Sequence, residues 1–292
     1  MSDPDRPSPH VGSVDSHGGF PGGSSQENSP SYLLAFEDSA FLRREELRPV
    51  RFQLELWKPE MLQNEAGIRS TVVVFGSARI RERKVAEEQL QRAKENARQD
   101  PDNPLLARRV NTARRLLDKS RFYSEAREFA ALMSRSCQID GRCEYVVVTG
   151  GGPGIMEAAN RGAFDVGAKS IGLNISLPFE QEPNHYITPQ LSFQFHYFAL
   201  RKMHFLMRAK ALVVFPGGFG TFDELFVTLT LIQTGKVEPL PVLLYNRAFW
   251  ERAIDFAFLA EEGTISPEDL DLIEFVETPE EAWKAIQNFY GE

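Results

Sequence analysis

The sequence contains little cysteine and no long apolar run. Cys137 and Cys143 are the only cysteines among 292 residues, and their spacing fits no common zinc motif. So few thiols are typical of a reducing compartment, in which both stay free. No apolar run approaches the roughly 20 residues of a membrane-spanning helix, and no basic segment followed by an apolar one resembles a secretory signal. We therefore expect a cytoplasmic protein without a membrane partner.

An excess of basic residues is also missing. The formal net charge is −8. Proteins that bind nucleic acid without regard to its sequence need a cationic face, so we expect no nucleic-acid partner, although a small cationic pocket is compatible with this charge. His185 and His196 have no spacing that suggests ligands of a metal ion. We expect neither a metal nor a cofactor.

The composition divides the chain into a tail and one domain. Residues 1–30 are rich in Gly, Ser and Pro and hold almost nothing to bury, which predicts a disordered tail. Residues 31–68 are expected to form a partly helical strap, from Leu42 to Leu56 with a break at Pro49. A charged segment at about 80–121, interrupted by Pro101 and Pro104, predicts a helical hairpin. We expect one domain over 31–292 that carries this insertion.

Strands and helices alternate from Thr71 onward. Short apolar runs predict buried strands at 71–75, 145–149, 170–175, 211–215 and 241–245, with a further short strand at 273–276. Helices are expected at 123–136, 155–162, 195–210, 222–233, 249–259 and 280–290. This alternation predicts an α/β fold: a Rossmann-like, doubly wound, mostly parallel sheet with helices on both faces. In such sheets ligands bind at the carboxyl ends of the strands.

Three glycine turns follow predicted strands and are expected to converge on one ligand. Free backbone amides and a helix N-terminus together favour a phosphate group. After the last turn, Thr221 is expected to cap a helix, with the carboxylate of Glu224 beside it. The alternative is that the glycines only permit tight turns, which accounts for one such turn more easily than for two. The predicted binding residues are Gly76, Ser77, Gly150, Gly151, Gly152, Gly154, Gly217, Gly218, Gly220 and Thr221.

The spacing of these glycines argues against two common nucleotide sites. Ile155 stands where the third glycine of a dinucleotide-binding G-x-G-x-x-G motif would fall, and Asn174 stands where an acid would hold the ribose. No G-x-x-x-x-G-K-[ST] segment is present, which excludes a P-loop triphosphatase. A mononucleotide or sugar-phosphate site remains.

Four segments together resemble the Lonely Guy (LOG) family, whose members are often named lysine decarboxylases. The segments are Gly76-Ser-Ala-Arg79, Thr149-Gly-Gly-Gly-Pro-Gly-Ile-Met-Glu157, Arg201-Lys202 and Pro216-Gly-Gly-Phe-Gly-Thr-Phe-Asp-Glu224. The resemblance covers roughly Thr71 to Tyr245, apart from the charged hairpin. It implies a phosphoribohydrolase that cleaves a nucleoside 5′-monophosphate, either AMP or a cytokinin riboside monophosphate, to free base and ribose 5-phosphate. It also implies a homodimer or a larger homo-oligomer.

The resemblance makes Arg201 and Glu224 the catalytic pair, with Lys202 as a supporting substrate contact. A carboxylate near the anomeric carbon can stabilise the positive charge that develops on the ribose as the base departs. The structural alternative for Glu224 is a capping box with Thr221. Arg201 has the alternative of a solvated basic stripe with His204 and Arg208, and solvation is the preferred interpretation for those two residues.

Two interpretations of the function stay open at this point. One is the hydrolase, and the other is a non-catalytic carrier of a nucleotide or of molybdenum cofactor, which needs a phosphate cradle but not Arg201 and Glu224. Amino-acid decarboxylation would need pyridoxal phosphate on a lysine, and no motif supports it. Compact LOG proteins lack the segment at about 80–121. We expect that segment to be solvated surface, an oligomer contact or a lid.

Overall fold

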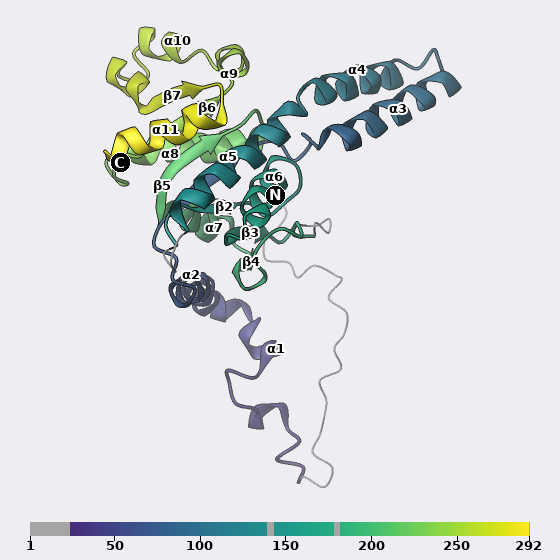
Figure 1. Cartoon of the computed structure of the whole chain (residues 1–292). Coiled ribbons are helices and arrows are strands. Elements are labelled where there is room, and N and C mark those ends of the chain that lie inside the picture. Colours follow the sequence, from purple (N-terminus) through teal and green to yellow (C-terminus); the bar gives the residue numbers. More distant parts are fainter. Residues whose placement is uncertain (1–23, 139–142, 178–181, 292) are drawn as a thin grey trace.

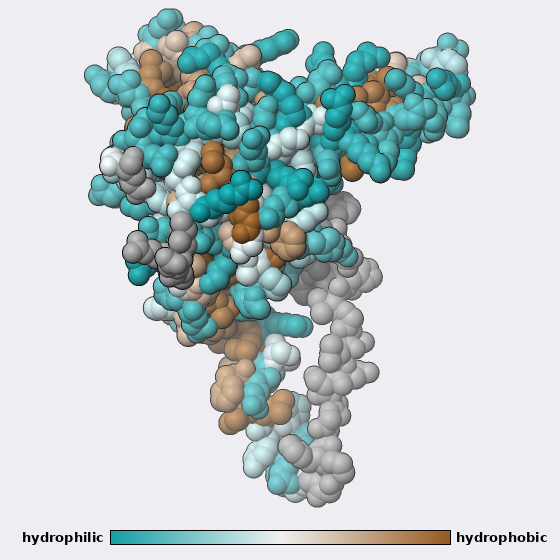
Figure 2. All heavy atoms as spheres, in the orientation of Figure 1, coloured by the Kyte–Doolittle hydropathy of each residue, from teal (hydrophilic) through white to brown (hydrophobic). Residues whose placement is uncertain are grey.

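The computed structural model describes residues 24–138, 143–177 and 182–291, so most of the tail predicted at 1–30 lies outside the described residues. Residues 24–47 form an arm with short helical turns, η1 (Pro30–Tyr32), α1 (Ser39–Leu42) and η2 (Glu45–Leu47). The arm extends away from the body of the molecule (Figure 1). Apolar residues colour part of it brown in Figure 2, and the exposed ones include Tyr32, Leu33, Leu34 and Phe36.

The body is built on one sheet, which contains seven strands within the described residues. The strands are β1 (Thr71–Phe75), β2 (Val146–Thr149), β3 (Ser170–Ile175), β4 (Ser192–Phe195), β5 (Ala209–Val214), β6 (Val242–Tyr245) and β7 (Ile273–Val276). Their spatial order is β4-β3-β2-β1-β5-β6-β7, and every neighbouring pair is parallel. The predicted α/β class with a parallel sheet is confirmed.

Helices connect the strands. Along the chain they are α2 (Arg48–Glu65), α3 (Arg83–Gln99), α4 (Pro104–Asp118), α5 (Arg121–Cys137), α6 (Ile155–Asp165), α7 (Phe198–Leu206), α8 (Phe219–Gln233), α9 (Arg247–Ala253), α10 (Phe256–Glu261) and α11 (Pro279–Tyr290). Two further 3-10 turns are η3 (Pro189–Leu191) and η4 (Pro267–Leu272).

Two of the predicted helices are wrong in their extent. The helix expected at 195–210 is preceded by the unpredicted strand β4, in which Phe193 and Phe195 are buried and Gln194 is exposed. Four residues are too few for this alternation to distinguish a strand from the start of a helix. The single helix expected at 249–259 is divided into α9 and α10, because Ile254 is extended and the Asp255 carboxylate caps α10 by accepting a hydrogen bond from the Phe258 amide.

The strap also differs from its prediction. Pro49 lies in the first turn of α2, where a proline has no amide bond to lose, so it begins the helix and does not break it. On the side that meets α7, Glu60 forms an ion pair with Arg208 at 2.7 Å. His204 is only 5% exposed, and burial lowers its pKa. The interpretation of His204 and Arg208 as a solvated basic face is therefore wrong.

The sheet carries a hydrophobic core on each of its two faces. Alternate strand residues point to opposite faces, so that Val72 and Val74 join one core and Val73 and Phe75 join the other. The first core includes side chains of α5, α6 and α11, and the second includes side chains of α7, α8 and α9. Apolar side chains thus surround the sheet on both sides, as its continuous Val-rich strands require.

The inserted hairpin is formed by α3 and α4, which lie against each other and project from the body (Figure 1). Its visible surface is mostly hydrophilic (Figure 2). Ala86 and Leu90 of α3 are buried, but no residue of α4 is. The chain then returns to the core directly after α4, since Phe122 and Tyr123 at the start of α5 are fully buried.

Candidate active site

The order of the strands reverses at β1, which pairs with β2 on one side and with β5 on the other. The turns that follow β1 and β5 therefore lie side by side. Two backbone hydrogen bonds join them, from the Phe215 amide to the Phe75 carbonyl at 2.9 Å and from the Ser77 amide to the Pro216 carbonyl at 3.0 Å. Such a reversal point is where open α/β sheets bind ligands.

A cleft of about 830 Å³ opens at this point. Its walls come from the turn after β1, the turn after β5 with the start of α8, one face of α7, and the last residues of the hairpin. The lining residues are Phe75 to Ile80, Leu116, Lys119, Met156, Phe198, Arg201, Pro216 to Glu224, and Phe249. Of the residues predicted to bind substrate or catalyse, the structure brings together here Gly76, Ser77, Arg201, Gly217, Gly218, Gly220, Thr221 and Glu224.

The turn after β5 presents unpaired backbone amides to the cleft. Helix α8 begins at Phe219, three residues earlier than predicted, and Gly218 is its N-cap. The amides of Gly217, Gly218, Phe219 and Gly220 donate no hydrogen bond to any described residue. Amides at a helix N-terminus carry a partial positive charge that favours an anion. This end of the cleft is therefore suited to a phosphate group.

The position of the helix start excludes the predicted capping role of Thr221. Thr221 is the third residue of α8, and its side chain packs against Gly217, where an added Cβ would overlap it. Glu224 lies a further turn into the helix, too far along to return to the N-cap amide as a capping box requires. The structural alternative for Glu224 is thus wrong.

Glu224 is a buried carboxylate on the wall of the cleft. Its side chain is 11% exposed, and Oε1 lies 3.8 Å from Lys202 Nζ. Burial raises the pKa of Glu224, and the charges of Lys202 and Arg201 oppose this rise. The carboxylate accepts no hydrogen bond from a described residue, so its oxygens are available to a ligand.

Arg201 enters the cleft from α7. Its Nε donates to the Leu173 carbonyl at 2.8 Å, and its guanidinium lies over the Phe205 ring with 5.2 Å between the guanidinium carbon and the ring centroid. Burial lowers its pKa, and the charge of Glu224 acts in the opposite direction. These contacts hold the guanidinium in place, and Arg201 lines the cleft together with Glu224.

Lys202, the neighbour of Arg201, does not line the cleft. Its ammonium group forms an ion pair with Asp223 at 2.6 Å and lies 3.8 Å from Glu224. It therefore acts on Glu224, and its role as a substrate contact stays a prediction.

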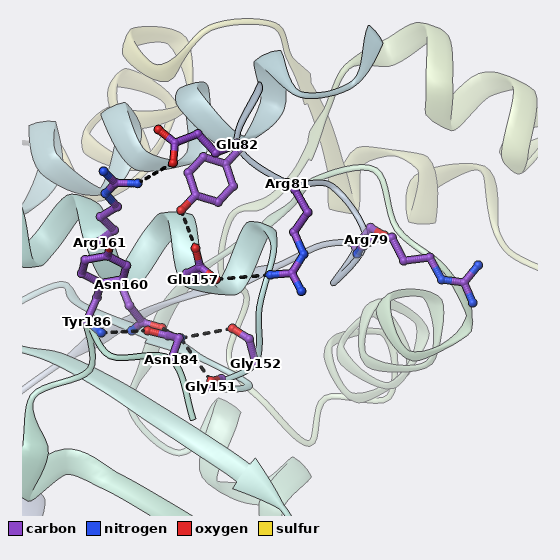
Figure 3. Close-up of polar contacts among 12 residues, drawn as sticks. Arg79, Arg81, Glu82, Gly151, Gly152, Glu157, Asn160, Arg161, Asn184 and Tyr186 are labelled. Atoms are coloured by element: carbon purple, nitrogen blue, oxygen red, sulfur yellow. Dashed lines mark hydrogen bonds and ion pairs between the residues drawn. The ribbon is translucent and has the colours of Figure 1, made fainter. Parts of the chain in front are cut away.

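The glycines of the turn after β2 also lie outside the cleft wall. An added Cβ at Gly150 would lie 2.6 Å from Arg201 Nη2, so this glycine leaves room for the guanidinium. Gly151 and Gly152 accept hydrogen bonds from the Asn184 side chain through their carbonyls (Figure 3). Gly154, with a φ of +76°, packs directly on the backbone of Ser77. These four glycines are not among the residues that line the cleft, and their part in binding a ligand stays a prediction.

The loop between β1 and the hairpin is held to α6 by polar contacts (Figure 3). Arg81 pairs with Glu157 at 3.3 Å, and Arg161 pairs with Glu82 at 3.0 Å. Glu157 also accepts a hydrogen bond from the Tyr123 hydroxyl at 2.7 Å. Glu157 thus connects three elements at the base of the hairpin.

Sequence reasoning missed several residues of the cleft. Phe198, Phe222 and Phe249 line it with Met156, and Phe219 is 97% exposed at its rim. The position of Arg79, two residues after Ser77 in the first glycine turn, could have indicated that it lies at the cleft. No sequence feature indicates that Leu116 and Lys119 line the cleft, because they belong to a segment whose composition is typical of solvated surface.

The described residues contain no group of three or more His, Cys, Asp or Glu that could hold a metal ion. Among the helices of residues 24–138, 143–177 and 182–291, none is long and apolar enough to cross a membrane.

Residues 156–286 match a family model described as possible lysine decarboxylase, the model of the LOG proteins. These residues, called the LOG region below, are similar to the LOG proteins. They include Arg201, Lys202 and the glycine turn with Glu224, whereas the turn after β1 and the hairpin precede them. Comparison with curated proteins finds no match.

Two solved structures resemble part of this chain. One is the molybdenum cofactor binding protein of the phototrophic bacterium Rippkaea orientalis, with 18% identity and a TM-score of 0.43 over 58% of this chain and 88% of that one. The other is TM1055, a structural genomics target, with 18% identity and a TM-score of 0.45 over 75% of this chain and 99% of that one. At these TM-scores neither similarity indicates what the present chain binds.

Replacing Gly154 by alanine tests the contact between the turns after β1 and β2. Gly154 and Gly235 both have a positive φ, so either alanine costs about 1 kcal/mol in backbone strain. At Gly154 the new Cβ would in addition overlap the Ser77 carbonyl, while at Gly235 it meets nothing within 4 Å. By urea denaturation we expect Gly154→Ala to lower the free energy of unfolding by about 2–4 kcal/mol. Equal losses in the two variants would contradict the packing described here.

Proposed function

We propose that this protein hydrolyses the N-glycosidic bond of a nucleoside 5′-monophosphate and releases the free base and ribose 5-phosphate. The observation that carries the proposal is a buried carboxylate, Glu224, on the wall of a cleft whose neighbouring wall is the free N-terminus of α8. The Glu224 carboxylate can stabilise a developing cation, and the N-terminus of α8 can bind a phosphate. A phosphorylated ribose offers both charges within one small molecule.

The phosphate is assigned to the start of α8. The four free amides and the helix dipole provide donors without requiring a side chain, and glycine at 217, 218 and 220 lets a ligand approach the backbone closely. Nothing lies within 4 Å of an added Cβ at Gly218 or Gly220. That open space is consistent with a phosphate group of the ligand bound at this turn.

The bond cleavage is assigned to Glu224. As the bond between C1′ and the base nitrogen breaks, positive charge develops on the ribose, and a nearby carboxylate stabilises it. The same carboxylate can take a proton from water as the water oxygen bonds to C1′, while the departing base nitrogen gains a proton. A pKa raised by burial makes Glu224 a stronger base than an exposed glutamate.

Two cations oppose the rise that burial causes in the pKa of Glu224. Lys202 is oriented by Asp223, and Arg201 is oriented by the Leu173 carbonyl. The base is assigned to the apolar side of the cleft, where Met156, Phe198 and Phe249 offer stacking surfaces. This surface accepts adenine and an apolar N6 substituent alike, so both AMP and a cytokinin nucleotide are candidate substrates. A cytoplasmic location and a homo-oligomeric assembly remain part of the proposal.

The proposal is tested by incubating the protein with AMP, and separately with isopentenyl-AMP, and measuring released base by chromatography. The wild-type protein should release base and ribose 5-phosphate in equal amounts. Glu224→Gln should slow the release by about 100-fold or more, the usual contribution of a positioned acid or base. Glu262→Gln, an exposed glutamate at the end of α10, is the matched control and should retain full activity.

The same experiment separates the hydrolase from a carrier. A carrier of nucleotide or molybdenum cofactor needs the amides of α8 but not a reactive carboxylate. Tight binding of the nucleotides without release of base from either, in the wild-type protein, would refute the hydrolase and favour the carrier.

The rate should also depend on pH through Glu224. Activity that needs the carboxylate is present above its pKa and lost as the pH falls through it, so the acid limb of kcat/KM should lie above that of an exposed glutamate. Lys202 lowers this pKa and Asp223 raises it. Lys202→Met should therefore shift the acid limb to higher pH, and Asp223→Asn should shift it to lower pH. Shifts in the same direction would show that another group titrates.

A further inference from the structure

The base of the inserted hairpin forms part of the cleft. Leu116 and Lys119, at the end of α4, line it together with the start of α8, and Arg79 lines it from the loop that leads into α3. Both connections between the hairpin and the body thus border the space in which a ligand would lie. A role as solvated surface alone does not account for this placement, whereas the oligomer contact and the lid stay predictions.

Arg79 and Lys119 differ from the other charged residues of the cleft. Asp223 and Glu224 face Lys202, and Arg201 donates to a backbone carbonyl. Within the described residues, the side chains of Arg79 and Lys119 make no hydrogen bond and no ion pair. Two cations that border a cleft without an anion of the protein are suited to an anion from outside.

The surroundings hold both residues in place. Arg79 follows the turn that Ser77 stabilises, with the Ser77 hydroxyl accepting from the Arg79 amide at 3.1 Å. The next two residues, Arg81 and Glu82, are fixed to α6, and Arg79 extends away from that network (Figure 3). Lys119 directly precedes the buried Ser120. The backbone that carries both cations is therefore held by contacts with the body of the molecule, although the tip of the hairpin is solvated.

We propose that Arg79 and Lys119 bind the phosphate group of the nucleotide, and that the α3–α4 insertion is in this way a part of the substrate site. A phosphate ester carries a charge near −2 at neutral pH. The α8 amides offer only partial charges. Lys202 pairs with Asp223, and Arg201 donates to the Leu173 carbonyl, so two further cations complete the neutralisation. The inference rests on the proposed function only in that the ligand is a phosphorylated nucleoside, whether or not it is cleaved.

The test separates the phosphate from the base. Calorimetry would measure the binding of ribose 5-phosphate, which lacks the base, and of adenosine, which lacks the phosphate, to the wild-type protein and to Arg79→Ala and Lys119→Ala. Binding of AMP would be measured in the Glu224→Gln background to prevent turnover. Lys94→Ala and Arg109→Ala remove the same charges from exposed positions of the same hairpin, away from the cleft, and are the matched controls.

We expect each cleft variant to weaken the binding of ribose 5-phosphate and AMP by about tenfold, with adenosine unchanged and both controls equal to the wild type. Arg79→Lys, which keeps the charge, should restore part of the affinity. Unchanged affinity for ribose 5-phosphate in the cleft variants would overturn the inference, and so would equal weakening of adenosine, because the residues would then act on the shape of the cleft.

The experiments distinguish failure of the proposed hydrolase activity from failure of this inference. If the wild-type protein binds ribose 5-phosphate and AMP but releases no base, the hydrolase fails while the phosphate contacts of Arg79 and Lys119 can still be established by the variants. If the wild-type protein binds neither phosphorylated ligand, both the proposed function and this inference fail. If AMP is hydrolysed and the cleft variants bind as the wild type does, only this inference fails.

Discussion

The cleft depends on the reversal of strand order at β1. Because all seven strands of the described residues run parallel, the carboxyl ends of β1 and β5 lie at one edge, and the chain leaves them toward opposite faces of the sheet. The chain from β1 reaches α5 in one core, while the chain from β5 enters α8 in the other. The cleft lies between the two segments that follow β1 and β5. Backbone hydrogen bonds hold the two turns together without any side chain. The side chains of both walls are therefore available to contact a ligand.

The burial of Glu224 creates the electrostatic character of this site. A carboxylate that is largely removed from water is costly to ionise unless cations lie near it. Here Lys202 stands at 3.8 Å and Arg201 acts on it from α7. Neither cation makes a hydrogen bond with the carboxylate, which is a different arrangement from a closed ion pair. The two cations thus favour the charged form of Glu224 while its oxygens stay available, a combination that a structural glutamate at a helix start does not need.

The fold could be predicted from the sequence more fully than the site. Buried parallel strands are continuous apolar runs, so β1, β3 and β7 were predicted at their observed bounds, whereas the short edge strand β4 was missed. The site was predicted through its backbone turns, and the structure assembles two of the three at the cleft. Spacing could not show that Gly150 makes room for Arg201, that Arg208 pairs with Glu60 of α2, or that Lys119 borders the cleft, because each depends on which distant surface lies next to the residue.

The two walls of the cleft differ in origin. The wall with Arg201 and Glu224 lies within residues 156–286, the LOG region, and the wall with Ser77, Arg79 and Lys119 precedes it. The first wall holds the only buried carboxylate among the charged lining residues, and the second holds cations without a protein partner. A reacting group must keep its position relative to one bond, but a phosphate accepts donors from many directions. An insertion at the second wall can therefore change how the ligand is held while the geometry around Glu224 stays the same.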